Sequence, residues 1–138
     1  MPLHSTFSHP LRLVITVAKG DVLPREMLDY LGRLDASGAR PYRKIFDVTA
    51  LEMPITSEAI RNLASIVRAR EAEGPVGPVA IVVGTDSAYR KAQLFVREAT
   101  MKRPIKVFRE QHQARKWLDS FEAAPKDGNP DDPPRRSG

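Results

Sequence analysis

The chain has 138 residues, of which 41% are hydrophobic, 28% charged and 7% aromatic. This length and composition are typical of one globular domain and argue against a disordered, collagen-like or membrane-spanning chain. The absence of cysteine excludes a disulfide scaffold, a thiolate nucleophile and a cysteine-ligated metal centre. Lysine and arginine number 22 against 17 acidic residues, a net charge of +5, so a polyanionic partner has to be considered.

The sequence contains no segment typical of membrane insertion or secretion. Its longest apolar run, Val79 to Val83, is far shorter than the roughly 18 residues that a membrane-spanning helix needs. The first residues, Met1 to Pro10, lack the apolar stretch and small-residue cleavage site of a secretory signal. We therefore expect a cytoplasmic protein without a membrane span.

The first half of the chain predicts alternating strands and helices. Leu11 to Ala18 is typical of a strand, and Pro24 to Ala36 of a helix that ends near Gly38. A second strand is predicted over Arg43 to Val48. The next helix covers Thr56 to Arg70, and its apolar residues lie on one stripe, namely Ile60, Leu63, Ala64 and Val67.

The second half continues the alternation. Val79 to Val83 is a continuous run rich in β-branched residues, which is typical of a strand covered on both faces and predicts the centre of the sheet. Asp86 to Met101 is expected to be a helix, in which Asp86 or Ser87 accepts hydrogen bonds from the first free amides. Two further elements complete the pattern, a short strand over Ile105 to Phe108 and a last helix over Glu110 to Phe121.

Four strand-then-helix units favour parallel strands, because each unit needs a crossover connection that packs a helix against the sheet. We therefore predict an α/β fold with a four- to five-stranded, mostly parallel (mixed) sheet flanked by about four helices. Residues 1–9 are expected to form a leader, with a short edge strand over Leu3 to Phe7 as an open alternative. Residues 10–121 form the domain, and the proline-rich residues 122–138 are expected to be a disordered tail.

The order of these segments resembles a known family. The resemblance is carried by Leu11 to Gly20, Tyr42 to Asp47 with its Phe-Asp end, Val79 to Val83, Val107-Phe-Arg109, and Ala114-Arg-Lys-Trp-Leu118. Over about residues 10–121 the chain is similar to the STAS/SEC14 (SpoIIAA-like) family. This resemblance implies a mixed sheet flanked by helices and no known enzymatic reaction. We accordingly expect a binding or signalling module that has no enzyme activity and no cofactor.

The resemblance also draws attention to the start of the helix near residue 56. In the anti-anti-sigma branch of the superfamily, a regulatory serine lies there within an Asp-Ser-Ser-Gly-like motif. The corresponding stretch is Pro54-Ile-Thr-Ser-Glu58, so Thr56 and Ser57 keep hydroxyl groups while the flanking Asp and Gly are missing. Either a hydroxyl is phosphorylated at the positive end of the helix dipole, or it caps the helix, which is the interpretation we favour.

Polar residues also follow three of the predicted strands. In open parallel sheets, ligands bind beyond the carboxyl ends of the strands, where helix N-termini also point. We therefore predict a surface for a protein partner or a small anionic ligand that includes Asp47, Thr49, Thr56, Ser57, Asp86, Ser87, Tyr89 and Arg109. The structural alternative, which we favour, is that Asp47 binds amides of its own loop and Arg109 pairs with Glu110 or Asp86.

The SEC14-like side of the resemblance suggests a second function, a carrier for a lipid or another small apolar molecule. The side chains that could line its pocket are equally good core residues, namely Phe46, Tyr89, Phe95 and Met101. A chain of this size has little apolar material left for a lipid-sized cavity once its sheet is covered. We would expect such a cavity only at the seam of a homodimer.

Basic residues gather in three clusters, so nucleic acid has to be weighed as a partner. The clusters lie within Arg40 to Lys44, Arg61 to Arg70, and Arg90 to Arg103. Phosphate binding favours an uninterrupted positive stripe with exposed aromatic rings, whereas acidic residues interrupt or follow the second and third clusters. A mixed, solvated surface explains the clusters better, and we do not expect nucleic acid.

Catalytic and metal-binding motifs are lacking. The three histidines, His4, His9 and His112, are far apart, and neither a serine-nucleophile elbow nor a phosphate-binding loop occurs. We therefore predict no catalytic residue and no metal. The expected partner is another protein or a second copy of this chain.

Overall fold

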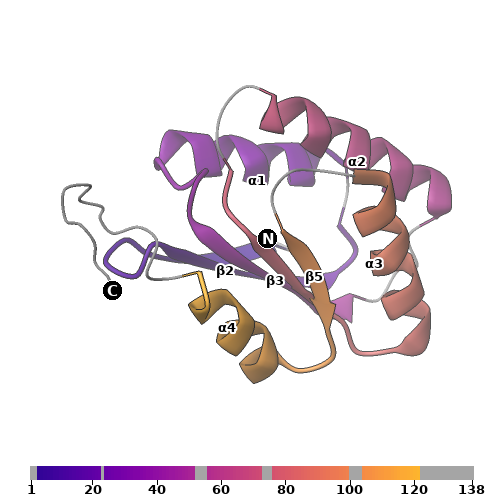
Figure 1. The fold of residues 1–138 in the computed structure, drawn as a ribbon. Helices are drawn as coiled ribbons and strands as arrows, with labels where there is room; N and C mark the ends of the chain where they lie inside the picture. Colours follow the sequence, from indigo (N-terminus) through magenta and orange to yellow (C-terminus); the bar gives the residue numbers. More distant parts are fainter. Residues whose placement is uncertain (1–2, 23, 52–55, 73–75, 100–103, 122–138) are drawn as a thin grey trace.

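The computed structural model describes residues 3–22, 24–51, 56–72, 76–99 and 104–121. Within these ranges the chain has the predicted α/β fold (Figure 1). The strands are β1 (Leu3–Ser8), β2 (Leu13–Gly20), β3 (Arg43–Leu51), β4 (Val79–Val82) and β5 (Ile105–Phe108). The helices are α1 (Pro24–Ala36), α2 (Ser57–Glu71), α3 (Asp86–Ala99) and α4 (Gln111–Asp119). The predicted tail, residues 122–138, and the last two positions of the predicted third helix lie outside the described residues.

The order of strands in the sheet follows their order in the chain, β1-β2-β3-β4-β5. β1 is antiparallel to β2, and the other neighbouring strands are parallel. The edge strand that the sequence left open therefore forms, with Leu3 opposite Ala18 and Ser8 opposite Leu13. The prediction that Val79 to Val83 is the centre of the sheet was wrong, because β3 lies in the middle and β4 is one position further out.

The helices are divided unequally between the two faces of the sheet. Because each crossover moves one strand further in the same direction, right-handed connections bring α1, α2 and α3 to one face. Figure 1 shows α1 and α2 above the sheet, α3 at its right-hand side and α4 below it. α2 lies against α3. No helix in the described ranges is long and apolar enough to cross a membrane.

The core consists of two layers, one on each face of the sheet. In β4, Ala80 and Val82 pack in the cluster that contains α4, whereas Ile81 packs with Val83 and α3 on the other face. The predicted cover of this strand on both faces is therefore confirmed, and it explains the continuous apolar run. The remaining buried residues of the α4 layer are Leu13, Ile45, Ala114 and Leu118, and those of the layer under α1 include Leu3, Val14, Ala18, Tyr30 and Leu34.

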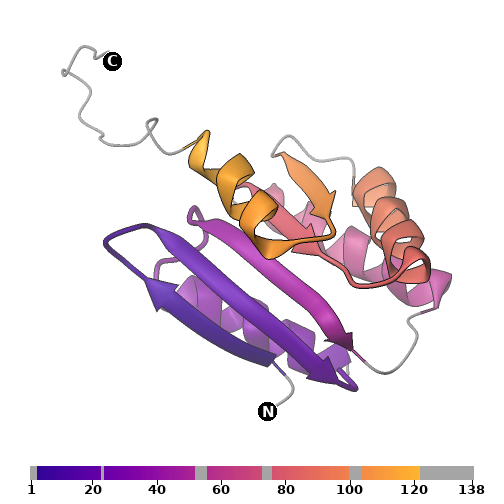
Figure 2. The same cartoon turned by 90° about the horizontal axis from the view of Figure 1, so that it is seen from below.

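α4 covers only part of its face of the sheet. α4 packs against β3, β4 and β5, and Figure 2 shows that β1 and most of β2 have no described helix over this face. His4 and Thr6 of β1 are exposed there, while Ile15 and Val17 of β2 are half-buried. This surface is thus more polar than the covered part of the same face.

Two cations at the start of β3 are buried, which corrects the expectation that this cluster forms part of a solvated surface. They are Arg43 and Lys44. The Lys44 Nζ donates hydrogen bonds to the carbonyl oxygens of Arg40 at 2.6 Å and Tyr42 at 2.8 Å. Backbone carbonyls of the segment before β3 therefore supply the acceptors that a buried ammonium needs.

Arg43 links α4 to the turn between β1 and β2. Its Nη2 donates to the carbonyl oxygen of Leu11 at 2.7 Å, and its Nη1 lies 3.1 Å from Oδ1 of Asp119 and 3.4 Å from the carbonyl oxygen of Leu118. One buried guanidinium thus joins the first turn of the chain to its last described helix.

Candidate functional site

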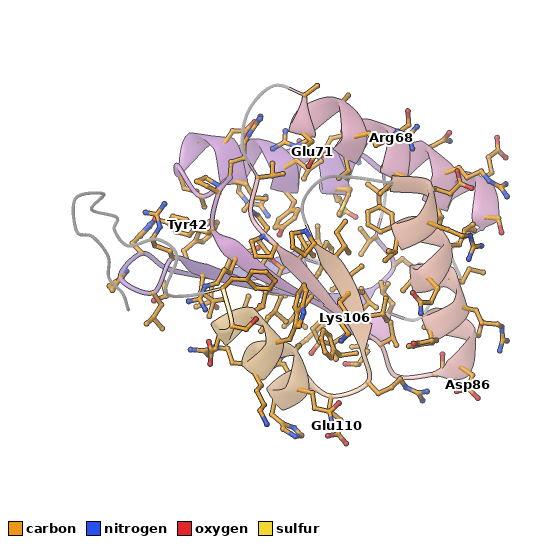
Figure 3. All side chains as sticks on the ribbon, in the orientation of Figure 1. Tyr42, Arg68, Glu71, Asp86, Lys106 and Glu110 are labelled. Atoms are coloured by element: carbon orange, nitrogen blue, oxygen red, sulfur yellow. The ribbon has the colours of Figure 1, made fainter. Side chains whose placement is uncertain are left out.

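Because β3, β4 and β5 are parallel, their carboxyl ends lie together at one end of the strands. Most of the predicted site residues are found there. We call this surface the strand-end edge and define it by Asp47, Thr49, Asp86, Ser87, Arg109 and the start of α2 at Thr56 and Ser57. Figure 3 shows Asp86 at this edge and Tyr42 at the opposite end of the sheet. The ends of β3 and β4 are in close contact, because a Cβ atom added at Gly84 would lie 3.6 Å from that of Thr49.

Asp47 accepts hydrogen bonds from a residue of its own strand and from α4. Its Oδ1 accepts hydrogen bonds from the backbone amide of Thr49 at 2.9 Å and from the Thr49 hydroxyl at 2.7 Å. The prediction that Asp47 binds a nearby amide is correct, but the amide belongs to β3 and not to a following loop, because the strand continues to Leu51. Its Oδ2 accepts a hydrogen bond from Nε2 of Gln111 at 3.1 Å. Sequence reasoning missed Gln111, which lies 64 residues away in the chain.

Arg109 forms an ion pair across the edge. Its Nη1 lies 2.9 Å from Oδ1 of Asp86. Asp86 is one of the two partners, Glu110 or Asp86, that the sequence predicted for Arg109. Glu110, the other one, lies 3.4 Å from Nδ1 of His112. The side chains of Arg109 and Asp86 are 48% and 82% exposed, so solvent screens the ion pair and it contributes little to stability. Both charged groups are accessible at the surface.

The start of α2 is capped by Thr56. The Thr56 Oγ1 accepts a hydrogen bond from the backbone amide of Ala59 at 3.1 Å, which confirms capping as a role of this hydroxyl. Ser57 is the first residue of the helix, and both side chains are exposed. Thr56 therefore caps α2, and Ser57 lies beside it at the surface.

The cap of α3 differs from the predicted one. Thr85 Oγ1, not the side chain of Asp86 or Ser87, accepts the hydrogen bond from the Ala88 amide, at 3.0 Å. The helix begins at Asp86, and the capping side chain belongs to the residue that precedes the first helical one. Asp86 and Ser87 are consequently exposed on the first turn, beside Arg109.

The aromatic candidates pack in the interior rather than at the strand-end edge. Tyr89 is half-buried against the cluster under α3, and its hydroxyl accepts a hydrogen bond from Nε2 of Gln93 at 3.1 Å. The ring of Phe46 lies 5.6 Å from that of Tyr30. Two of the side chains named for a carrier pocket are therefore in core contacts, and Met101 lies outside the described residues.

The strand-end edge has mixed charge. The N-termini of α2, α3 and α4 lie on this side of the sheet, so the positive ends of their helix dipoles give it a positive potential. Acidic residues on the first turns, Glu58 and Asp86, oppose that potential, and Arg109 adds a cation. Such a surface can donate and accept hydrogen bonds and can pair with charges of either sign. In the part of the chain that is described, no three histidine, aspartate or glutamate side chains group as metal ligands.

No family model matches the chain, and no curated protein matches it. The observed fold agrees with the sheet and helices that the STAS/SEC14 resemblance implied. Membership of that family remains a prediction.

Proposed function

We propose that this chain is a non-enzymatic, STAS-like binding module of the cytoplasm, which engages a protein partner through the strand-end edge and the start of α2. One observation carries the proposal. Exposed carboxylate, guanidinium and hydroxyl groups from three strand ends are held at one edge by contacts between elements, Asp47 with Gln111 and Asp86 with Arg109.

The exposure of these groups favours a protein over a small molecule. Small-ligand sites are concave and enclose most of the ligand, whereas Asp86 and Arg109 project from the edge with large exposed fractions. A protein can match such a surface with polar groups of its own. Because Thr49 and Gln111 hold the Asp47 carboxylate before binding, little conformational entropy is lost at that residue when a partner arrives.

We assign different roles to the two hydroxyls at the start of α2. Thr56 stabilises the helix through its bond to the Ala59 amide, so Ser57 is the hydroxyl that a partner or a modifying enzyme would meet. A phosphate on Ser57 would lie at the positive end of the helix dipole. The resemblance to the anti-anti-sigma branch gives this position its regulatory interest.

A capture experiment with the tagged full chain tests the proposal. The variant combines Thr56→Asn, which keeps a capping side chain, with Ser57→Ala and Arg109→Gln. We expect proteins captured by the wild type from its host, identified by mass spectrometry, to be at least tenfold depleted with the variant. Arg115→Gln is the matched control, since Arg115 is a partly exposed arginine of α4 that pairs with Asp119 away from this edge. Undiminished capture by the triple variant would refute the proposal.

A further inference from the structure

We propose that the outer edge of β1 pairs with β1 of a second copy of this chain. The two strands run antiparallel across a two-fold axis and join the two sheets into one continuous sheet. This inference is independent of the proposed function, because the outer edge of β1 is not part of the strand-end edge.

The outer edge of β1 is open in the described structure. β1 is the last strand on its side of the sheet, and Figure 2 shows it along the rim with no described element beyond it. Within the described ranges, only β2 pairs with β1. The backbone amides and carbonyls on the other side of Leu3–Ser8 are therefore a template for the addition of another strand.

The two edges of the sheet differ in how they are protected. β5, at the other edge, has four residues, carries the exposed Lys106 and follows Pro104. Short length, an edge lysine and a nearby proline are features that discourage pairing between edges. β1 has six residues, no charged residue and no proline, and its register with β2 is unbroken over all six. Only the β5 edge thus carries these protective features.

Charge favours a second copy as the occupant. With a net charge of +5, two copies repel each other least where the surfaces that meet carry no cation. Leu3–Ser8 contains no lysine, arginine, aspartate or glutamate. It offers a neutral contact that is the same on both copies, as a two-fold axis requires.

The pairing that symmetry allows is chemically compatible. Residues directly opposite each other in an antiparallel pair lie on the same face of the sheet, so a two-fold axis must pass through a residue and not between two residues. In the middle of Leu3–Ser8, that residue is Ser5 or Thr6. An axis at Ser5 places His4 opposite Thr6, and an axis at Thr6 places His4 opposite Ser8. On the face that carries His4 and Thr6, both arrangements place polar side chains opposite each other and no like charges.

β1 is also held in place before any partner arrives. The Ser5 Oγ lies 3.0 Å from Oγ1 of Thr16, which in turn donates to the hydroxyl of Tyr30 at 3.0 Å. This chain of hydrogen bonds runs from the edge strand through β2 to α1, and Leu3 is buried beside it. A strand that is already ordered loses little entropy when it pairs.

Sedimentation and light scattering of the full chain test the inference. We expect the wild type to form dimers in the micromolar range. The double variant His4→Lys/Thr6→Lys, whose native side chains are exposed, places lysines opposite each other in either register and should weaken the dimer at least tenfold. His4→Glu/Thr6→Glu should do the same, and mixing the two variants should restore a heterodimer. Ser65→Lys/Gln113→Lys adds the same charge at exposed positions of α2 and α4 and should remain dimeric.

Hydrogen exchange on the wild type supplies a readout that does not depend on the variants. Protection of the Leu3–Ser8 amides should rise with protein concentration, while that of β5 should not change. A wild type that stays monomeric, a lysine variant that remains dimeric, or exchange of β1 that is independent of concentration would each overturn the inference.

Discussion

Arg70 binds Asp35 with both terminal nitrogens of its guanidinium. Its Nη2 lies 2.7 Å from Oδ1, and its Nη1 lies 3.1 Å from Oδ2. Nε of Arg40 approaches the same carboxylate at 3.1 Å. The hydrogen bonds from Arg70, and then those from Arg40, lower the pKa of Asp35 from 3.8 to about 2. The end of α1 is thereby joined to the end of α2 and to the segment before β3.

Asp35→Asn should destabilise the protein at neutral pH and lose its effect in strong acid. The folded pKa of Asp35 lies below its unfolded value of 3.8, so the stabilisation is complete above that value and disappears as the pH falls towards about 2. Because the side chain is 40% exposed, solvent screens the interaction, and we expect a loss of about 1 kcal/mol at neutral pH. Urea unfolding of both proteins across this pH range measures the difference, and a loss that does not change with pH would contradict the explanation.

Gly77→Ala should be strongly destabilising. An added Cβ would lie 2.5 Å from the carbonyl oxygen of Pro41 and closer still to that of Tyr42. Both atoms belong to the backbone, so relief requires a shift of the chain, and we expect a loss of more than about 2 kcal/mol. Gly32→Ala is the matched control, since nothing lies within 4 Å of its added Cβ and it is inside α1, where alanine should gain about 0.5–1 kcal/mol. Thermal unfolding should move the two melting temperatures in opposite directions.

Lys44→Met should cost about 1–3 kcal/mol in the free energy of unfolding. Methionine fills similar space but leaves the carbonyl oxygens of Arg40 and Tyr42 without the ammonium that donates to them. Lys116→Met removes an exposed lysine of α4 and should change the stability by less than about 0.5 kcal/mol. Denaturant titration of the two variants checks this difference, and equal stabilities would show that burial of Lys44 is unimportant.

The class of the fold could be predicted because it depends on local patterns. Apolar periodicity and turn residues placed α1 at Pro24–Ala36 and β5 at Ile105–Phe108 with the observed bounds. Strand order was harder. The apolar run of β4 reports cover by α3 and α4 on its two faces, whereas β3 begins with buried cations that obscure its central position. A sequence pattern records burial, not the identity of the neighbouring strand.

For the candidate site, the location could be predicted from the sequence, but the contacts between elements could not. Parallel strands bring their carboxyl ends to one edge, so the location of Asp47, Asp86 and Arg109 followed from the fold class. The bond between Asp47 and Gln111 did not, since it depends on how α4 docks. Likewise, Arg43 and Lys44 bind backbone carbonyls, and such acceptors leave no trace in the pattern of side chains.

The sequential strand order has a consequence for synthesis. Each strand lies beside its predecessor in the chain, so successive units can pack as they leave the ribosome, and long-range searches are few. One exception is the link that Arg43 makes between Leu11 and Asp119. It can close only after the last helix is translated, and until then Leu13, Ile45 and Val82 lack the cover of α4. Nascent chains that stall before residue 111 would therefore expose an apolar strip on which chaperones can act.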